Sequence, residues 1–162
     1  MIRTLLVDDH AFFRTTIKSF LNSMPEISLV GEAADGLEAL RVLHSQQPEF
    51  VLMDVQMPHM DGIEACKRIH LQDERIKVLL YTGFDLESIP SENLRQCAGL
   101  LSKQDLFSAL PDWLKHNFGC DRTKATPTAP VKMHSTEPMQ KRMHGRASRK
   151  DVQNPSASED VQ

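Results

Sequence analysis

The sequence predicts an α/β protein with a doubly wound parallel sheet of five strands. Apolar runs and segments of helical periodicity alternate along the first 118 residues. The central run, residues 50–53, is apolar throughout, which is typical of a strand buried on both faces. Acidic or turn-forming residues follow most of the runs. Strands that alternate with helices favour a parallel sheet covered on both faces and joined by right-handed crossovers.

The expected strands are short apolar segments that end at polar residues. They are residues 2–7, 27–34, 50–54, 76–81 and 98–102. The first ends at Asp8-Asp9, the fourth at Thr82-Gly83 and the fifth just before Lys103. The polar side chains that could take part in chemistry therefore lie at the carboxyl ends of the expected strands.

Helices are expected wherever apolar side chains recur every three or four residues. Such stripes begin near residues 11, 37, 63 and 106. Pro25 and Pro48 close the first two of these units. Residues 85–96 have a weaker pattern, and Pro90 is not tolerated in a helix interior, so a short or broken helix is expected there.

Composition and charge divide the chain at about residue 118. The last 44 residues are polar, with 8 Lys and Arg against 5 Asp and Glu, whereas the preceding part has 11 against 17. We therefore expect a folded domain over residues 1–118 and a disordered polar and basic tail over residues 119–162. The basic cluster at residues 141–150 is consistent with contact to nucleic acid or an acidic partner, but a solvated terminus is the expected state.

The cellular compartment of the protein is predicted from features that its sequence lacks. No signal peptide pattern and no apolar run of membrane length is present. The cysteines are Cys66, Cys97 and Cys120, an odd number with no spacing that suits zinc or a redox pair. A cytoplasmic protein with reduced thiols is expected.

Polar side chains are expected to converge at the carboxyl edge of the sheet. Strand ends place three carboxylates (Asp8, Asp9, Asp54), one hydroxyl (Thr82) and one ammonium (Lys103) there. At an effective dielectric constant of 20, two carboxylates about 4–5 Å apart repel by roughly 3–4 kcal/mol, which a divalent cation would remove. An all-oxygen site suits Mg²⁺. Together these groups could accept a phosphoryl group.

Each of these residues also has a simpler interpretation. Asp54 could cap the next helix, although Asp61 before Gly62 is better placed to do so. Lys103 taken alone could be a solvated surface lysine, and Asp8-Asp9 could be only a helix cap. The functional interpretation rests on their joint occurrence at strand ends.

Four motifs resemble the signature of response-regulator receiver domains. They are Val7-Asp8-Asp9-His10, residues 53–62, Tyr81-Thr82-Gly83 and Ser102-Lys103. The resemblance covers residues 1 to about 118 and is greatest to the branch that often carries a helix-turn-helix domain. It implies a flavodoxin-like fold with strand order 2-1-3-4-5. It also implies a two-component signalling protein, not an enzyme, that catalyses only its own phosphorylation and dephosphorylation.

The resemblance implies a role for each site residue. Asp54 would accept the phosphoryl group, and Lys103 and Thr82 would contact it. Asp9 and Asp54 would bind Mg²⁺ directly, Asp8 would act through metal-bound water, and the backbone carbonyl of Gln56 would be a third protein ligand. The phosphoryl donor would be a sensor histidine kinase or a histidine phosphotransfer protein.

The sequence departs from the family pattern at a position that concerns switching. Leu100 stands where these receivers usually carry the aromatic residue that changes rotamer on phosphorylation, so the switch is expected to be absent or built differently. Gln56 and Phe84 stand where neighbours of the site tune hydrolysis, and we hypothesise that the bulky Phe84 slows loss of the phosphoryl group.

Two alternatives remain open. One is an interaction module of the same fold that binds a partner constitutively, without phosphorylation. The other, a small phosphatase, is disfavoured because Gln56 stands where a second carboxylate is needed. The expected output is contact with a downstream protein target, with homodimer formation open and neither a membrane nor direct DNA contact expected.

Overall fold

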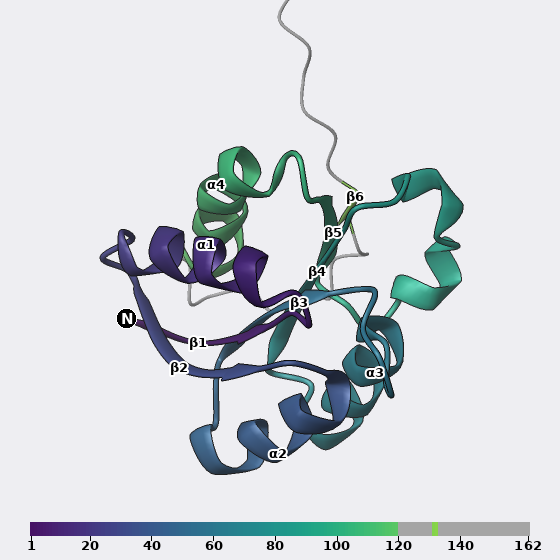
Figure 1. Ribbon diagram of the computed structural model, residues 1–162, viewed down its shortest axis with the longest axis horizontal. Helices are drawn as coiled ribbons and strands as arrows, with labels where there is room; N and C mark the ends of the chain where they lie inside the picture. The colour runs from purple at the N-terminus through teal and green to yellow at the C-terminus, as the bar shows by residue number, and fades with distance from the viewer. Residues whose placement is uncertain (120–130, 133–162) are drawn as a thin grey trace, which may run out of the picture.

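The computed structural model describes residues 1–119 and 131–132, which form one parallel sheet flanked by helices (Figure 1). The strand order is β2-β1-β3-β4-β5-β6. The strands are β1 (Ile2–Val7), β2 (Ile27–Ala33), β3 (Phe50–Asp54), β4 (Lys77–Thr82), β5 (Gly99–Ser102) and β6 (Val131–Lys132). The helices are α1 (Ala11–Asn22), α2 (Gly36–Gln46), α3 (Gly62–Gln72) and α4 (Leu106–Phe118). The flavodoxin-like order 2-1-3-4-5 predicted for the first five strands is confirmed.

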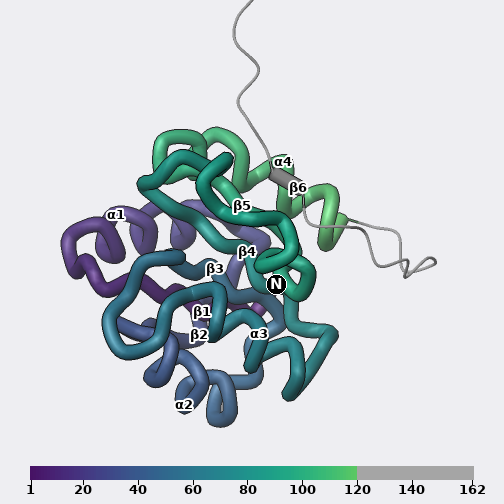
Figure 2. The backbone as a smooth tube through the Cα atoms, turned by 90° about the vertical axis from the view of Figure 1, so that its right-hand side faces the viewer, coloured from purple at the N-terminus to yellow at the C-terminus, as the bar shows by residue number. Residues whose placement is uncertain are grey.

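The helices cover the two faces of the sheet in pairs. Helices α1 and α4 lie on one face, and α2 and α3 lie on the other (Figures 1 and 2). Each face buries its own apolar cluster, with Leu6, Ile17 and Leu110 in the first and Leu5, Leu43 and Ile69 in the second. Because β1, β3 and β4 are covered on both faces, their side chains are apolar in nearly continuous runs.

The N-terminus of α3 is capped by Asp61, so Asp54 is not needed as a helix cap. Asp61 is the residue before the helix, and its Oδ1 accepts a hydrogen bond of 2.8 Å from the backbone N–H of Glu64. This is the capping arrangement that stabilises a helix N-terminus. The cap is therefore supplied by Asp61, as the sequence predicted, and not by Asp54.

The segment between β4 and β5 contains no full α-helix. Two short 3-10 helices, Leu86–Ser88 and Ser91–Leu94, take its place, and Pro90 lies between them. Pro90 has no N–H to donate and its ring blocks the preceding turn, so one continuous helix cannot form across it. The broken fourth helix predicted from the sequence is confirmed.

A sixth strand lies at the edge of the sheet, next to β5. Val131 and Lys132 pair in parallel with Gly99 and Leu100. The sequence predicted five strands and placed residues 131–132 in a disordered tail, so this pair of residues is a difference from the expectation. Apart from Gly119, the rest of that tail, including the basic cluster at residues 141–150, lies outside the described residues. Among the described helices, none has the length and apolar character needed to cross a membrane.

A disulfide joins Cys66 of α3 to Cys97, which precedes β5. Their Cα atoms are 6.0 Å apart, and both side chains are buried. The expectation that these thiols are reduced is therefore wrong for this pair. The pairing could not be read from spacing, because the two cysteines are 31 residues apart and meet only when α3 packs beside the end of the β4–β5 connection. Cys120 lies outside the described residues.

Reduction of this disulfide is expected to destabilise the fold. The cross-link spans a sequence separation of 31 residues, and closing a loop of that size restricts the unfolded chain by about 3–4 kcal/mol. Urea unfolding with and without a reductant, in a Cys120→Ser background that prevents exchange, measures the difference. A Cys66→Ala, Cys97→Ala double variant should be insensitive to the reductant. Equal unfolding midpoints for the parent protein in both conditions would contradict the prediction.

Candidate functional site

Asp54 lies at the carboxyl end of β3 and is almost fully buried, with 2% of its surface exposed. Its Oδ2 accepts a hydrogen bond of 2.5 Å from Lys103 Nζ, and its Oδ1 accepts one of 3.2 Å from the backbone N–H of Gln56. Burial raises the pKa of the Asp54 carboxyl above its ordinary value, and nearby Asp8 adds to the rise, although Lys103 and Gln56 oppose it. The buried charge is therefore only partly compensated, so a further cation would stabilise it.

Three carboxylates converge at this edge of the sheet. One carboxylate oxygen from each of Asp8, Asp9 and Asp54 lies within 4.8 Å of the others. Asp8 and Asp54 are buried, whereas Asp9 is exposed to solvent. Mg²⁺ prefers hard oxygen ligands and keeps several of its waters, so a carboxylate cluster with one open side fits this ion. Ligation by the Gln56 carbonyl stays a prediction.

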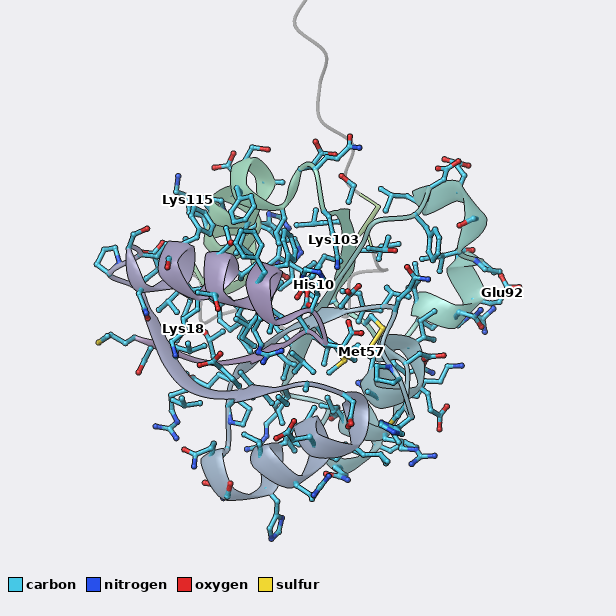
Figure 3. The ribbon with its side chains drawn as sticks, in the orientation of Figure 1. His10, Lys18, Met57, Glu92, Lys103 and Lys115 are labelled. Atoms are coloured by element: carbon cyan, nitrogen blue, oxygen red, sulfur yellow. A yellow bond between two sulfur atoms is a disulfide. The ribbon has the colours of Figure 1, made fainter. Side chains whose placement is uncertain are left out.

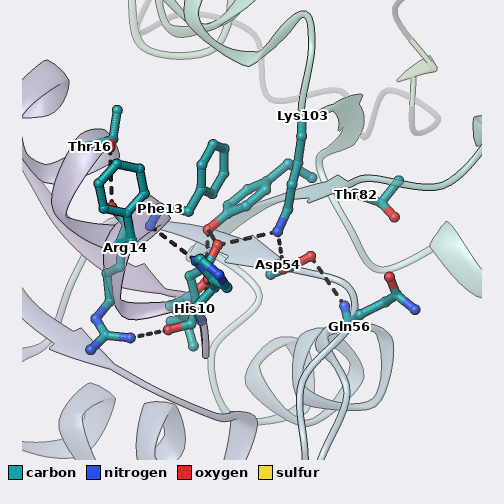
Figure 4. A network of polar contacts seen from close by, with 12 residues as sticks. His10, Phe13, Arg14, Thr16, Asp54, Gln56, Thr82 and Lys103 are labelled. Atoms are coloured by element: carbon teal, nitrogen blue, oxygen red, sulfur yellow. Dashed lines mark hydrogen bonds and ion pairs between the residues drawn. The ribbon is translucent and has the colours of Figure 1, made fainter.

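Lys103 follows β5 and reaches across to the carboxylates (Figure 4). Its Nζ lies 2.5 Å from Asp54 Oδ2 and 3.6 Å from Asp8 Oδ2. The same nitrogen lies 4.8 Å from the ring centroid of Phe13 and 5.5 Å from that of Tyr81. The ammonium is thus held by two carboxylates and two aromatic faces, and only 27% of its side chain is exposed. Figure 3 shows Lys103 near the centre of the view, with Glu92 and Lys115 toward its edges.

Thr82 ends β4 and is fully buried. Its Oγ1 accepts a hydrogen bond of 3.1 Å from the backbone N–H of Phe84. Figure 4 shows Thr82 to the right of the Asp54–Lys103 pair, with no dashed line between its hydroxyl and either residue. A hollow of about 290 Å³ is lined by Thr82, Phe84 and Lys103 among others, and Phe84 is 54% exposed at its rim. A threonine hydroxyl that is to contact a group on Asp54 must therefore turn toward it.

Leu100 lies on β5 and is fully buried. It belongs to the apolar cluster on the α2 and α3 face of the sheet, together with Leu86, Ile89 and Leu94 of the β4–β5 connection. An aliphatic side chain packed in this way has no ring that could move between a buried and an exposed position. That the switch is absent or built differently stays a prediction.

The sequence analysis missed two residues that shape the site. Tyr81 donates a hydrogen bond of 2.8 Å to Asp8 Oδ2, and burial together with Asp8 raises the pKa of its phenol, so the hydroxyl keeps its proton. His10 donates its backbone N–H to Asp8 Oδ1 at 2.7 Å and caps α1 by accepting at Nδ1 from the N–H of Phe13. The signals for Tyr81 were its place beside Thr82 in a quoted motif and its polar hydroxyl directly after the apolar residues Val78, Leu79 and Leu80.

The sequence matches the family model of the response regulator receiver domain over residues 4–107. These residues include every sequence-predicted site residue. The matched span also begins in β1 and ends at the start of α4, so it covers the five strands that order the site.

Curated relatives match the chain over about half of its length. The transcriptional regulatory protein LiaR of Bacillus subtilis is 43% identical over 84 residues, which is 52% of this chain and 40% of LiaR. A protein-glutamate methylesterase/protein-glutamine glutaminase of Methanosarcina mazei is 41% identical over 87 residues, which is 54% of this chain and 24% of that protein. The chain therefore spans less than half the length of these relatives.

Solved receiver structures have the same fold. The signal receiver domain of NarL from Mycobacterium tuberculosis superposes with a TM-score of 0.63 at 31% identity, covering 70% of this chain and 96% of that one. The response regulator domain of Thermotoga maritima CheB superposes with a TM-score of 0.66 at 29% identity, covering 75% and 98% of the two chains. In both cases nearly all of the solved domain is matched.

Proposed function

This chain belongs to the response regulator receiver domain family, and we propose on that premise that Asp54 accepts a phosphoryl group in two-component signal transduction. The observation that carries the proposal is the contact of 2.5 Å between Lys103 Nζ and Asp54 Oδ2 beside two further carboxylates. A buried carboxylate with a lysine at one oxygen and an acidic cluster nearby is suited to phosphoryl transfer, which depends on positioning and charge neutralisation.

The transfer would form a bond from an Asp54 carboxylate oxygen to phosphorus. The P–N bond to the imidazole of a donor phosphohistidine would break, and its electron pair would stay on the imidazole nitrogen. A Mg²⁺ ion held by Asp9 and Asp54, with Asp8 acting through water, would neutralise charge on the phosphoryl oxygens. Lys103 would move its ammonium from the free carboxylate onto the phosphoryl group, and Thr82 would turn its hydroxyl to donate to it.

The proposed partners follow from this chemistry. The donor is a sensor histidine kinase or a histidine phosphotransfer protein, and the output is contact with a downstream protein. The reaction is the protein's own modification and not turnover of an outside substrate. We place the protein in the cytoplasm, where the phosphohistidine of a sensor kinase would be accessible, although the Cys66–Cys97 disulfide is unusual for that compartment.

Phosphoryl uptake from a small donor tests the proposal directly. The full chain is incubated with Mg²⁺ and acetyl phosphate, and the mass of the intact protein is measured. One added phosphoryl group is expected on the parent protein and none on Asp54→Asn. Asp61→Asn is the matched control, because that carboxylate lies nearby but caps α3, and it should be modified like the parent. Equal uptake by the parent and by Asp54→Asn would overturn the assignment.

A receiver-fold module that binds its partner without phosphorylation is the second candidate. The observation in its favour is Leu100, which is buried where the family usually carries its mobile aromatic residue. In that case the parent and Asp54→Asn bind a co-purifying partner equally, with or without beryllofluoride. A phosphorylation-driven receiver instead loses the response to beryllofluoride in Asp54→Asn.

Phe84→Ala is expected to shorten the lifetime of the phosphorylated protein several-fold. The ring lies at the rim of the hollow beside Thr82 and Lys103, so its removal gives water more room near the acceptor. Loss of the phosphoryl group after removal of the donor can be followed by intact mass. Phe12→Ala removes an exposed aromatic ring from α1 instead and should leave the lifetime unchanged. An unchanged lifetime for Phe84→Ala would refute the hypothesis.

A further inference from the structure

We propose that Tyr81 is a positioning residue of the metal site, which holds the Asp8 carboxylate in place through its hydroxyl. The inference rests on the proposed function, because it concerns the same acidic cluster. Tyr81 itself would not contact the metal or the phosphoryl group. It would act through Asp8, whose carboxylate is one of the three that meet within 4.8 Å.

Both oxygens of Asp8 are engaged by the protein. Oδ1 accepts the backbone N–H of His10 at 2.7 Å, and Oδ2 accepts the Tyr81 hydroxyl at 2.8 Å. Asp8 is fully buried, so bulk solvent does not compete with these two donors for its side chain. A carboxylate fixed at both oxygens has one orientation, and a metal site benefits from ligands that are oriented in advance.

The hydroxyl also influences which carboxylate pairs with Lys103. Lys103 Nζ lies 2.5 Å from Asp54 Oδ2 but 3.6 Å from Asp8 Oδ2. Since Tyr81 already donates a hydrogen bond to Asp8 Oδ2, the negative charge on that oxygen is partly compensated and attracts the Lys103 ammonium less strongly. The lysine is thus directed to Asp54, the acceptor. The centroid of the Tyr81 ring lies 5.5 Å from Lys103 Nζ, so the ring also lines the space that the ammonium occupies.

Packing accounts for the ring of Tyr81 but not for its hydroxyl. The side chain belongs to the apolar cluster between the sheet and helices α1 and α4, where phenylalanine would fill the same space. The Val7 carbonyl oxygen, 3.2 Å from the Tyr81 hydroxyl, would be a sufficient acceptor if the buried hydroxyl needed only a hydrogen-bond partner. Its shorter contact is to Asp8, so the polar group is directed at the acidic cluster.

The protein carries its own reporter for this contact, because Tyr81 is its single tyrosine. Mg²⁺ alone is titrated into the full chain while the near-ultraviolet tyrosine absorption is recorded. A cation at the cluster changes the charge that the phenol faces at Asp8. The tyrosine band is therefore expected to shift with the same Mg²⁺ midpoint that calorimetry reports.

Two variants separate the hydroxyl from the aromatic packing. Tyr81→Phe removes only the hydroxyl and is expected to bind Mg²⁺ several-fold more weakly, because Asp8 acts on the ion through bound water and loses one of its two fixed partners. Phe20→Leu is the matched control, because its ring packs against Phe107 at 5.1 Å in the same cluster and makes no contact with Asp8 or Lys103. It should bind Mg²⁺ within twofold of the parent even if its thermal midpoint falls.

The outcomes distinguish this inference from the proposal on which it rests. Absence of Mg²⁺ binding by the parent would overturn both. Binding by the parent with unchanged affinity in Tyr81→Phe, or equal weakening in Phe20→Leu, would overturn the role of Tyr81 alone. If Tyr81→Phe does not fold, the parent titration decides, and a tyrosine band that stays in place throughout the Mg²⁺ titration rejects the inference.

Discussion

Replacement of Lys103 by alanine is expected to slow phosphoryl transfer to Asp54 by about 100- to 1,000-fold, the usual effect of removing a charge-stabilising donor from a buried site. Lys103 is the cation seen beside the acceptor in the described part of the chain, with its Nζ 2.5 Å from Asp54 Oδ2. Without it, negative charge that develops on the phosphoryl oxygens lacks its pre-positioned ammonium. The rate is measured as phosphoryl incorporation from acetyl phosphate at saturating Mg²⁺.

A lysine elsewhere provides the control for this experiment. Lys115→Ala removes a side chain that is 75% exposed on α4, and it should react at the rate of the parent. Mg²⁺ binding by Lys103→Ala should persist, because the three carboxylates remain. A rate within threefold of the parent would mean that the ammonium does not assist the transfer, whatever its position in the resting protein.

Gly62→Ala is expected to lower the free energy of unfolding by about 3 kcal/mol, since forcing extra atoms into a packed interior displaces its neighbours. A Cβ atom at this position would lie 2.2 Å from the backbone carbonyl oxygen of Asp54 and 3.1 Å from the Cα of Val55. Backbone atoms cannot turn away as a flexible side chain can. The substitution must therefore move the start of α3 or the end of β3, which carries the acceptor.

A second glycine at the same edge of the sheet provides the comparison. At Gly83 an added Cβ would meet only the Cδ atom of Lys103, at 3.9 Å, which is an ordinary contact. Urea unfolding of Gly62→Ala and Gly83→Ala should therefore differ clearly, with Gly83→Ala within about 1 kcal/mol of the parent. Equal stability of Gly62→Ala and the parent would show that β3 and α3 separate more easily than their packing implies.

The fold could be predicted because its determinants are local. Apolar runs such as residues 50–53 and helical stripes such as Leu106–Leu110–Leu114 are visible in the sequence itself. Alternation of the two element types then leaves few possible topologies, and the resemblance to receiver domains supplied the strand order. Even the break between β4 and β5 was visible, because Pro90 acts on its immediate neighbours through its ring and its missing N–H.

The composition of the candidate site was predictable for a related reason. Parallel strands end at one edge of a sheet, so residues that follow Val7, Met53 and Ser102 must lie near one another once the strand order is known. The convergence of Asp8, Asp9 and Asp54 within 4.8 Å, with Lys103 on Asp54, agrees with that expectation. The orientation of Thr82 was not predictable, because a short side chain can point either way at a strand end.

The amino-acid sequence by itself thus determined the sheet, its covering helices and the side chains delivered to its carboxyl edge. Only the tertiary structure decided three other contacts between groups distant along the chain. The Tyr81 hydroxyl meets Asp8 across 73 positions, the disulfide joins Cys66 and Cys97 across 31, and β6 adds to β5 from beyond α4. Such contacts depend on how whole helices and strands are placed relative to one another, and the packing of two apolar layers sets that placement. The contacts therefore leave no periodic signal within any one segment.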